Sequence, residues 1–358
     1  MQNKYLIQSM IIIIVSIYGC TEKSITMPED INKIEYSIND DFIDFLLGEV
    51  HFIDELNGWI NYMSGQGLLK TSDDGNSWKN VYFDSKSGPS AFYFINSNMG
   101  WFIHSIKGEK IAVLLTNNAG ESWSDLYTFN NEVSSPSYVS VDFVNDSIGW
   151  VSMCSDIIPT LEIFKTANGG RDWILQKSDI KPSYFQYNNF VNENTGWIST
   201  NSDIYKTRDG GQSWISQGEN IPKLSVNSPP SFGKTDFIDE YTGFIIQSGH
   251  ELFRTDDGGY TWIRIYNGKS ISPNNGQNSQ TQYCYDFFNS YLGAIAGDSL
   301  YITNDGGKSW EFIYGVDSDA DNHISSLCFA GKNTLFAVDK NNNILRFIIQ
   351  KLTDPAMI

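Results

Sequence analysis

The eight residues TRDGGQSW at 207–214 recur along the chain, and their recurrence decides the fold. Near-copies are TSDDGNSW at 71–78, TNNAGESW at 116–123, TANGGRDW at 166–173, TDDGGYTW at 255–262 and TNDGGKSW at 303–310. The first threonines of successive copies are 45, 50, 41, 48 and 48 residues apart. A period of this length indicates a solenoid, a propeller or an array of small units.

A second mark lies 9 to 16 residues before each copy. It is a glycine followed by a large residue, and it weakens toward the C-terminus: Gly58-Trp59, Gly100-Trp101, Gly149-Trp150, Gly196-Trp197, Gly243-Phe244 and Gly293-Ala294. Short apolar or alternating stretches lie before, between and after the two marks, as in SVDFVNDSIGW, WISTNSDIYKT and WIRIY. Four short strands in a repeat of about 40–45 residues predict one propeller blade.

The eight-residue unit is predicted to be a tight turn between the third and fourth strands of a blade. Its glycines suit positive φ, its Asp or Asn side chain accepts backbone hydrogen bonds, and its tryptophan buries a large ring. An active site is rarely repeated six times at regular spacing, so we expect these residues to serve the fold. They are Asp73, Gly75, Trp78, Asn118, Gly120, Trp123, Asn168, Gly170, Trp173, Asp209, Gly211, Trp214, Asp257, Gly259, Trp262, Asp305, Gly307 and Trp310.

This unit resembles the Asp-box, or BNR repeat, of sialidase-type propellers. Paired with Gly-Trp, it is more similar to the photosystem II stability and assembly factor family, which has relatives in non-photosynthetic bacteria. The resemblance covers about residues 49–310 and continues weakly to 349. It implies a seven-bladed β-propeller and says little about activity, because such turns occur in enzymes and non-enzymes alike.

Six turns give six blades, and the chain ends are expected to supply a seventh. Residues 324–349 hold three further strand-like runs without the turn, and the stretch near 34–38 supplies a fourth. We therefore predict an all-β, seven-bladed propeller over residues 32–350, closed by a blade made from both ends of the chain. A six-bladed ring with a loose tail is the alternative.

The N-terminus MQNKYLIQSMIIIIVSIYGC has one lysine, an apolar run and a small residue before cysteine, as in a secretory signal. Its ending resembles a bacterial lipobox. We expect a signal peptide at 1–19, lipidation of Cys20, a polar tether at 20–31 and a short tail at 351–358. Ordinary cleavage or an uncleaved anchor is the alternative. These features predict a cell-envelope protein held at a membrane surface by its lipid.

Composition excludes some partners. The formal net charge of −18 argues against nucleic acid, which needs a basic surface, and favours a cationic partner. The spacing of Cys154, Cys284 and Cys328 fits no metal motif. Cys284 and Cys328 are expected in equivalent first strands of adjacent blades, as free thiols or as a disulfide.

No catalytic residues are predicted. A sialidase needs three arginines around a carboxylate and an Arg-Ile-Pro motif; the chain has five scattered arginines and no such motif. A glycosidase carboxylate pair stays open, because carboxylates are plentiful. The run DSDADNH at 317–323 places Asp317, Asp319 and Asp321 at alternate positions, a weak calcium candidate, while an acidic surface loop is the simpler interpretation. No other cofactor is expected.

Recognition is expected on the blade face that carries the irregular loops, at 104–110, 154–162, 220–231 and 267–282. Two functions follow. The first is a monomeric, non-catalytic scaffold that binds another envelope protein. The second is a surface protein that binds or cleaves glycans. A carboxylate pair in the central channel would favour the second.

Overall fold

The computed structural model describes residues 31–37, 46–62, 67–83, 90–106, 110–129, 138–154, 161–176, 180, 185–222, 232–247, 251–267, 283–315 and 323–349. Within these ranges the chain forms strands and one 3-10 turn, η2 (Gly218–Asn220). The same ranges contain no helix that is long and apolar enough to span a membrane.

The first three blades follow one another along the chain, and each is an antiparallel sheet of four consecutive strands. Blade 1 contains β2 (Leu47–Phe52), β3 (Gly58–Tyr62), β4 (Gly67–Thr71) and β5 (Lys79–Phe83). Blade 2 contains β6 (Ser90–Phe94), β7 (Gly100–Ile106), β8 (Lys110–Thr116) and β9 (Ser124–Thr128). Blade 3 contains β10 (Tyr138–Phe143), β11 (Gly149–Cys154), β12 (Leu161–Thr166) and β13 (Ile174–Gln176).

The next three blades repeat the pattern. Blade 4 contains β14 (Phe185–Phe190), β15 (Gly196–Thr200), β16 (Ile204–Thr207) and β17 (Ile215–Ser216). Blade 5 contains β18 (Phe232–Phe237), β19 (Gly243–Gln247), β20 (Glu251–Thr255) and β21 (Ile263–Tyr266). Blade 6 contains β22 (Cys284–Phe287), β23 (Gly293–Ala296), β24 (Ser299–Thr303) and β25 (Glu311–Gly315).

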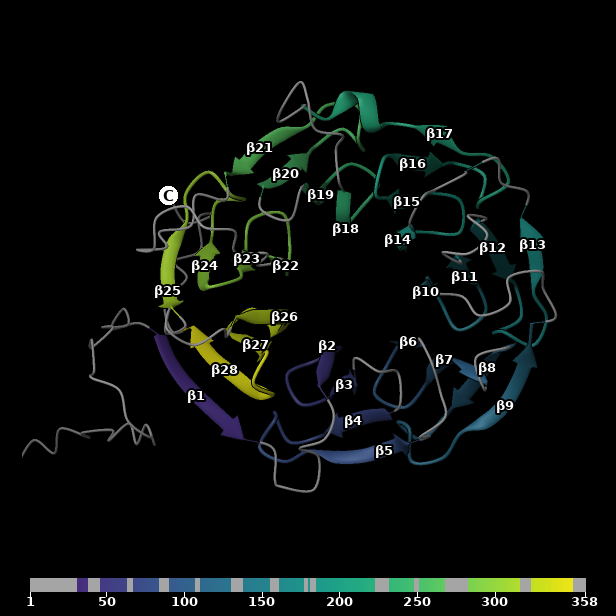
Figure 1. Ribbon diagram of the computed structural model, residues 1–358, viewed down its shortest axis with the longest axis horizontal. Helices are drawn as coiled ribbons and strands as arrows, with labels where there is room; N and C mark the ends of the chain where they lie inside the picture. Colours follow the sequence, from purple (N-terminus) through teal and green to yellow (C-terminus); the bar gives the residue numbers. More distant parts are fainter. Residues whose placement is uncertain are drawn as a thin grey trace, which may run out of the picture.

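Blade 7 joins the two ends of the chain. It contains β26 (Ile324–Gly331), β27 (Thr334–Asp339) and β28 (Asn343–Ile349), and its outermost strand is β1 (Ile31–Ser37). Strands β1 and β28 pair antiparallel from Ile31↔Ile349 to Ser37↔Asn343. The predicted seven-bladed ring and its closure are thus confirmed, with the N-terminal strand slightly earlier than expected, and the six-bladed alternative is wrong. The inner strands β2, β6, β10, β14, β18, β22 and β26 surround the axis of the ring (Figure 1).

Aromatic pairs hold neighbouring blades together. The tryptophan of a Gly-Trp pair lies flat on the phenylalanine that ends the inner strand of the next blade, as with Trp150 and Phe190, whose ring centroids are 3.6 Å apart. The pairs Trp59–Phe94, Trp101–Phe143, Trp197–Phe237, Phe244–Phe287 and Phe336–Phe52 stack in the same way. Each interface therefore buries large apolar surface in a fixed geometry.

The glycine of each Gly-Trp pair is required by close approach. A Cβ atom on Gly149 would lie 2.4 Å from the Phe143 ring, which crosses over this position from the inner strand of the same blade. The glycines of the five other pairs meet their own inner-strand phenylalanine at similar distances. Glycine here makes room for the ring that the neighbouring tryptophan stacks on.

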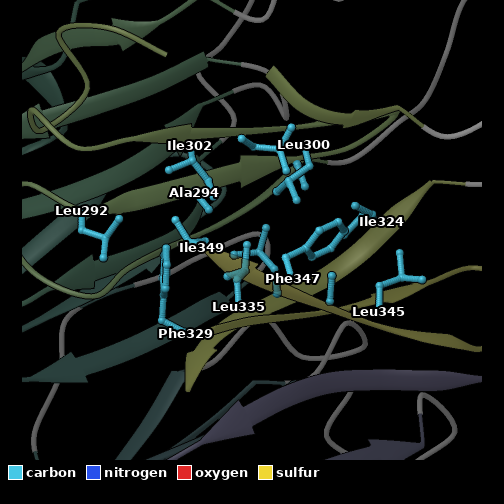
Figure 2. Packing of buried hydrophobic residues seen from close by; sticks show 14 residues of the cluster. Leu292, Ala294, Leu300, Ile302, Ile324, Phe329, Leu335, Leu345, Phe347 and Ile349 are labelled. Carbon is cyan, nitrogen blue, oxygen red and sulfur yellow. The ribbon is translucent and has the colours of Figure 1, made fainter. Parts of the chain in front are cut away.

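The interface between blades 6 and 7 is built without an aromatic stack. Ala294 takes the tryptophan position and is fully buried among apolar side chains shared by the two blades, including Leu335, Phe347 and Ile349 (Figure 2). Blade 7 lacks the repeated turn against which a tryptophan would pack. The sixth pair is therefore Gly293-Ala294, without a tryptophan, because blade 7 has no repeated turn for that ring to pack on.

Candidate functional site

The repeated turn is a closed hydrogen-bond network. In the copy at 207–214, the Thr207 hydroxyl donates to Asp209 Oδ1 at 2.8 Å and accepts from the Gly211 N–H at 2.9 Å. Asp209 also accepts from the N–H and the hydroxyl of Ser213, at 2.8 and 2.5 Å. Gly210 and Gly211 have φ of 72° and 99°, which glycine adopts without strain. The turn satisfies its own polar groups.

A second repeated turn joins the first and second strands of each of blades 1 to 6. Its Asp or Asn, always four residues before the glycine, accepts hydrogen bonds from the N–H groups two and three residues later, as Asn96 does from Asn98 and Met99 at 2.9 and 2.8 Å. The equivalent residues are Asp54, Asn145, Asn192, Asp239 and Asn289. The sequence analysis missed this motif, although its fixed distance from the glycine was a usable signal.

The two turns of a blade lie on the same face of the ring, here named the turn face. In blade 4 the Gly210 N–H donates to the Asn194 carbonyl, which belongs to the other turn, at 2.8 Å. Equivalent bonds join the two turns in the other five blades that carry them. This face is therefore regular. The opposite face, here named the loop face, carries the connections at 104–110, 154–162, 220–231 and 267–282, where recognition was expected, and much of it lies outside the described residues.

Hydrogen bonds to the turns also link successive blades. Trp101 and Trp150 donate their indole N–H groups to the Gly169 and Gly210 carbonyls of the next blade, both at 3.0 Å. In blades 4 and 5 a cation on the third strand does this instead. Lys206 donates to the Gly258 carbonyl at 3.0 Å, and Arg254 donates to the Gly306 carbonyl at 3.2 Å.

The five arginines lie in repeated turns of blades 3 and 4 and on the third or outer strands of blades 5 and 7. Arg208 donates to the Tyr260 hydroxyl, Arg171 to the Asn168 carbonyl, and Arg264 pairs with Glu251. Arg346 of blade 7 pairs with Asp74 in the blade 1 turn, beside the ring closure. The arginines therefore connect neighbouring elements around the ring.

The residue before the last phenylalanine of each inner strand forms a second set, here named the inner ring. It consists of His51, Tyr93, Asp142, Asn189, Asp236, Asp286 and Cys328. Four of them accept a hydrogen bond from the phenylalanine N–H of the following blade. The acceptors are Asp142 from Phe190 at 2.5 Å, Asn189 from Phe237 at 2.8 Å, Asp286 from Phe329 at 2.7 Å and Cys328 from Phe52 at 3.3 Å.

These bonds satisfy an exposed strand edge. An inner strand has no further strand on its axial side, so its axial N–H groups lack a ladder partner. The inner ring supplies acceptors from blade to blade, and Cys328 continues the series across the ring closure. Part of the acidic character of the inner strands is thus explained by backbone hydrogen bonding.

The remaining charges converge on one lysine. Lys234 of blade 5 interacts electrostatically with Asp236 of its own blade, Asp286 of blade 6 and Glu49 of blade 1, and with Tyr187 of blade 4. We call these five residues the central cluster. Burial alone would lower the pKa of Lys234, but the charges of Asp236 and Asp286 raise it well above its ordinary value. Side chains on the inner strands of four blades therefore interact electrostatically.

Burial shifts the neighbouring acids and the histidine. It raises the pKa of Asp142 to about 7, and the charge of Asp236 adds to the shift. It raises the pKa of Asp286 to about 6, although Lys234 acts in the opposite direction. Burial and the charge of Lys234 lower the pKa of His51 to about 4, so this side chain is neutral at pH 7. The axis therefore carries an excess of carboxylates.

Other sequence predictions have different outcomes. Cys284 and Cys328 lie in the inner strands of blades 6 and 7, as expected, and both are free thiols, as is Cys154. The calcium candidate Asp317, Asp319 and Asp321 and the lipidation site Cys20 lie outside the described residues. Among the residues that are described, no group of three His, Cys, Asp or Glu could hold a metal ion.

Comparison with known proteins adds the fold alone. No protein-family model matches the sequence, and no curated protein matches it. Solved structures do match. The chain shares 16% identity and a TM-score of 0.64 with "YCF48 bound to D1 peptide", over 90% of this chain and 99% of that one. With YCF48 from Cyanidioschyzon merolae it shares 15% identity and a TM-score of 0.62, over 89% and 99%.

A glycosidase has a similar fold. The GH74 enzyme of Niastella koreensis matches at 14% identity and a TM-score of 0.60, over 84% of this chain and 52% of that one. This chain therefore spans about half the length of that enzyme. Since the identities are all this low, the chain is similar to a peptide-binding propeller and to glycoside hydrolases in architecture only.

Proposed function

We propose that the chain is a cell-envelope lipoprotein, anchored through Cys20, whose propeller is a non-catalytic scaffold that binds a cationic segment of another envelope protein. The observation that carries the proposal is the central cluster, where Lys234 interacts electrostatically with three carboxyl groups, those of Glu49, Asp236 and Asp286. With the overall charge of −18, this axis attracts lysine and arginine side chains. The peptide-bound state of YCF48 shows that a propeller of this architecture can take a protein segment.

Two acids of the inner ring also have a non-catalytic task. Asp142 and Asp286 accept backbone N–H groups of the following blade, as Asn189 and Cys328 do at the equivalent positions. Since an amide and a thiol fill the same role, proton transfer is not required of it. This favours binding over catalysis at the axis.

The test is capture of a partner from detergent-solubilised envelope by the full chain. A Glu49→Gln/Asp236→Asn double variant is compared with Glu311→Gln, which removes a charge from an exposed outer strand. We expect a protein captured by the wild type and by Glu311→Gln, released by raised salt, and lost from the double variant. Capture that is unchanged in the double variant would contradict binding at the central cluster.

Glycoside cleavage is the second candidate, and one observation favours it. Asp142 and Asp286 have pKa values of about 7 and 6, close to the range of a general acid, and both lie on inner strands. We expect no hydrolysis of a panel of plant and bacterial glycans by the full chain. If the wild type hydrolyses a glycan and Asp142→Asn binds it but does not hydrolyse it, the protein is a glycosidase and the scaffold proposal is wrong.

A further inference from the structure

We propose that the part of the turn face formed by blades 5, 6, 7 and 1 lies against the lipid bilayer; this surface is named the membrane arc. The inference rests on the proposed lipid anchor and adds an orientation to it: the turn face points toward the membrane and the loop face points away from it.

One side-chain position carries the first observation. In each turn between first and second strands, the residue two before the glycine offers its carbonyl to the repeated turn, so its side chain is free to vary. In blades 2, 3 and 4 this residue is polar: Asn98, Ser147 and Asn194. In blades 5, 6 and 1 it is Tyr241, Tyr291 and Leu56, which are 64%, 57% and 54% exposed. The apolar residues at this position thus lie in blades 5, 6 and 1, on one arc of the ring.

Further aromatic side chains extend the same arc. Tyr260 on the repeated turn of blade 5 and Phe288 beside Tyr291 in blade 6 are also exposed. Arg254 joins the two blades through the Ser290 carbonyl at 2.6 Å. Tyrosine and phenylalanine on one rigid face form the kind of surface that settles at a membrane interface.

The course of the chain brings the first residue of β1 to this arc. Ile31, the first residue of β1, pairs with Ile349, whose N–H donates at 2.8 Å to the Asn333 carbonyl in the turn between β26 and β27. The chain therefore enters blade 7 on the turn face, between the apolar turns of blades 6 and 1. The eleven residue steps from Cys20 to Ile31 span at most roughly 40 Å. A lipid on Cys20 would hold Ile31, on this side of the ring, within roughly 40 Å of the bilayer.

The charges on the arc limit the contact to its surface. Glu55 and Glu240 are exposed beside Leu56 and Tyr241. Carboxylates resist transfer into hydrocarbon and are repelled by anionic lipids. The aromatic rings therefore reach the headgroup layer of a zwitterionic membrane while the acids stay in water.

The experiment uses the full lipidated chain, bound by its anchor to the outside of phosphatidylcholine vesicles. Single cysteines replace Tyr241, Tyr291, Asn194 and Lys340, and each variant reacts with a water-soluble maleimide before and after detergent is added. Asn194 is the matched turn position in blade 4, and Lys340 is exposed between β27 and β28 on the opposite face. Labelling of the unmodified chain corrects for Cys154, Cys284 and Cys328.

We expect vesicles to slow labelling of Tyr241→Cys and Tyr291→Cys by about tenfold, as for side chains at a membrane interface. Asn194→Cys and Lys340→Cys keep their rates. Equal rates at all four positions in a chain that remains on the vesicles would overturn the membrane arc and leave the anchor standing. A chain that carries no lipid and does not stay on vesicles would overturn both.

Discussion

Aspartate occurs on both the turn face and the inner ring, but Asp209 in the first is partly exposed and Asp142 in the second is buried. The partial burial of Asp209, which lies in a repeated turn, raises its pKa, but the hydrogen bonds from Ser213 and Thr207 lower it, and the net shift is downward. Asp142, on an inner strand, is buried, and its pKa rises to about 7 even though Phe190 donates an N–H to it. The first carboxylate stabilises the fold as an anion, and the second is destabilising when charged.

This difference explains why one region repeats and the other varies. A turn that closes on its own backbone needs the same few atoms in every blade, so Asp or Asn recurs six times. The inner ring needs only an acceptor that reaches the next blade, and Asp, Asn and Cys all supply one. Because several residue types fit the inner-ring positions, charged residues can be accommodated there.

The largest expected effect comes from removing an interface ring. Trp150→Ala loses the stack on Phe190 and the bond to the Gly210 carbonyl, and it leaves a cavity between blades 3 and 4. We expect the free energy of unfolding in urea to fall by about 4 kcal/mol. Ile174→Ala, at an exposed position of the same blade, should change it little. A loss below about 1 kcal/mol for Trp150→Ala would mean that the stacks do not hold the ring together.

The next effect is a pH dependence that only the inner ring should produce. The pKa of Asp142 is raised to about 7 in the folded protein, from about 4 in the unfolded chain. The stability that this group contributes is therefore fully present below about pH 4 and is lost as the pH rises to about 7. We expect this group to lower the free energy of unfolding over that range by of order 3 kcal/mol. Asp142→Asn keeps an acceptor for Phe190 and should flatten the profile.

The exposed carboxylate of Asp125 is the matched control. Asp125→Asn should leave the profile between pH 4 and pH 7 as it is in the wild type. The lowered pKa of Asp209 acts in the other direction, since its contribution is lost only as pH falls below about 4. A profile unchanged by Asp142→Asn would show that the buried acid is not the source.

A smaller effect is expected from one repeated turn. Asp209→Ala removes the acceptor for Thr207 and Ser213 and should cost about 1–2 kcal/mol, measured by urea unfolding. Asp209→Asn should cost less, because Asn118 and Asn168 fill this position in blades 2 and 3. Gln212→Ala, in the same turn but exposed, is the control. Lost partner capture at unchanged stability would contradict a structural role for these turns.

The fold could be predicted from the sequence because each blade is specified by short local motifs that repeat along the chain. Each Gly-Trp pair and each repeated turn can be recognised without knowing its neighbour. A closing strand near residues 34–38 was predicted because the last blade lacked a strand, and the structure has it at 31–37. The weakened pairs were harder to interpret. At Phe244 the indole donor is lost, and Arg254 of the same blade donates to the Gly306 carbonyl of the next blade instead. Ala294 faces blade 7, which lacks the repeated turn.

The candidate site could not be predicted in this way. Glu49, Tyr187 and Lys234 come from blades 1, 4 and 5, and only closure of the ring brings them together. Their sequence contexts share no motif, and an acid on an alternating strand gives no sign of which side faces the axis. Proximity across a ring is a property of the closed structure.

The last and smallest effect concerns the turn that the sequence analysis missed. Asn96→Ala removes the acceptor for the N–H groups of Asn98 and Met99, which water then has to satisfy, and should cost about 1 kcal/mol in urea unfolding. Ser97→Ala, in the same turn, should cost close to nothing. If the two variants unfold alike, the Asp or Asn four residues before the glycine repeats for a reason other than stability. The recurring turn residues would then have to be explained by what the turn face binds.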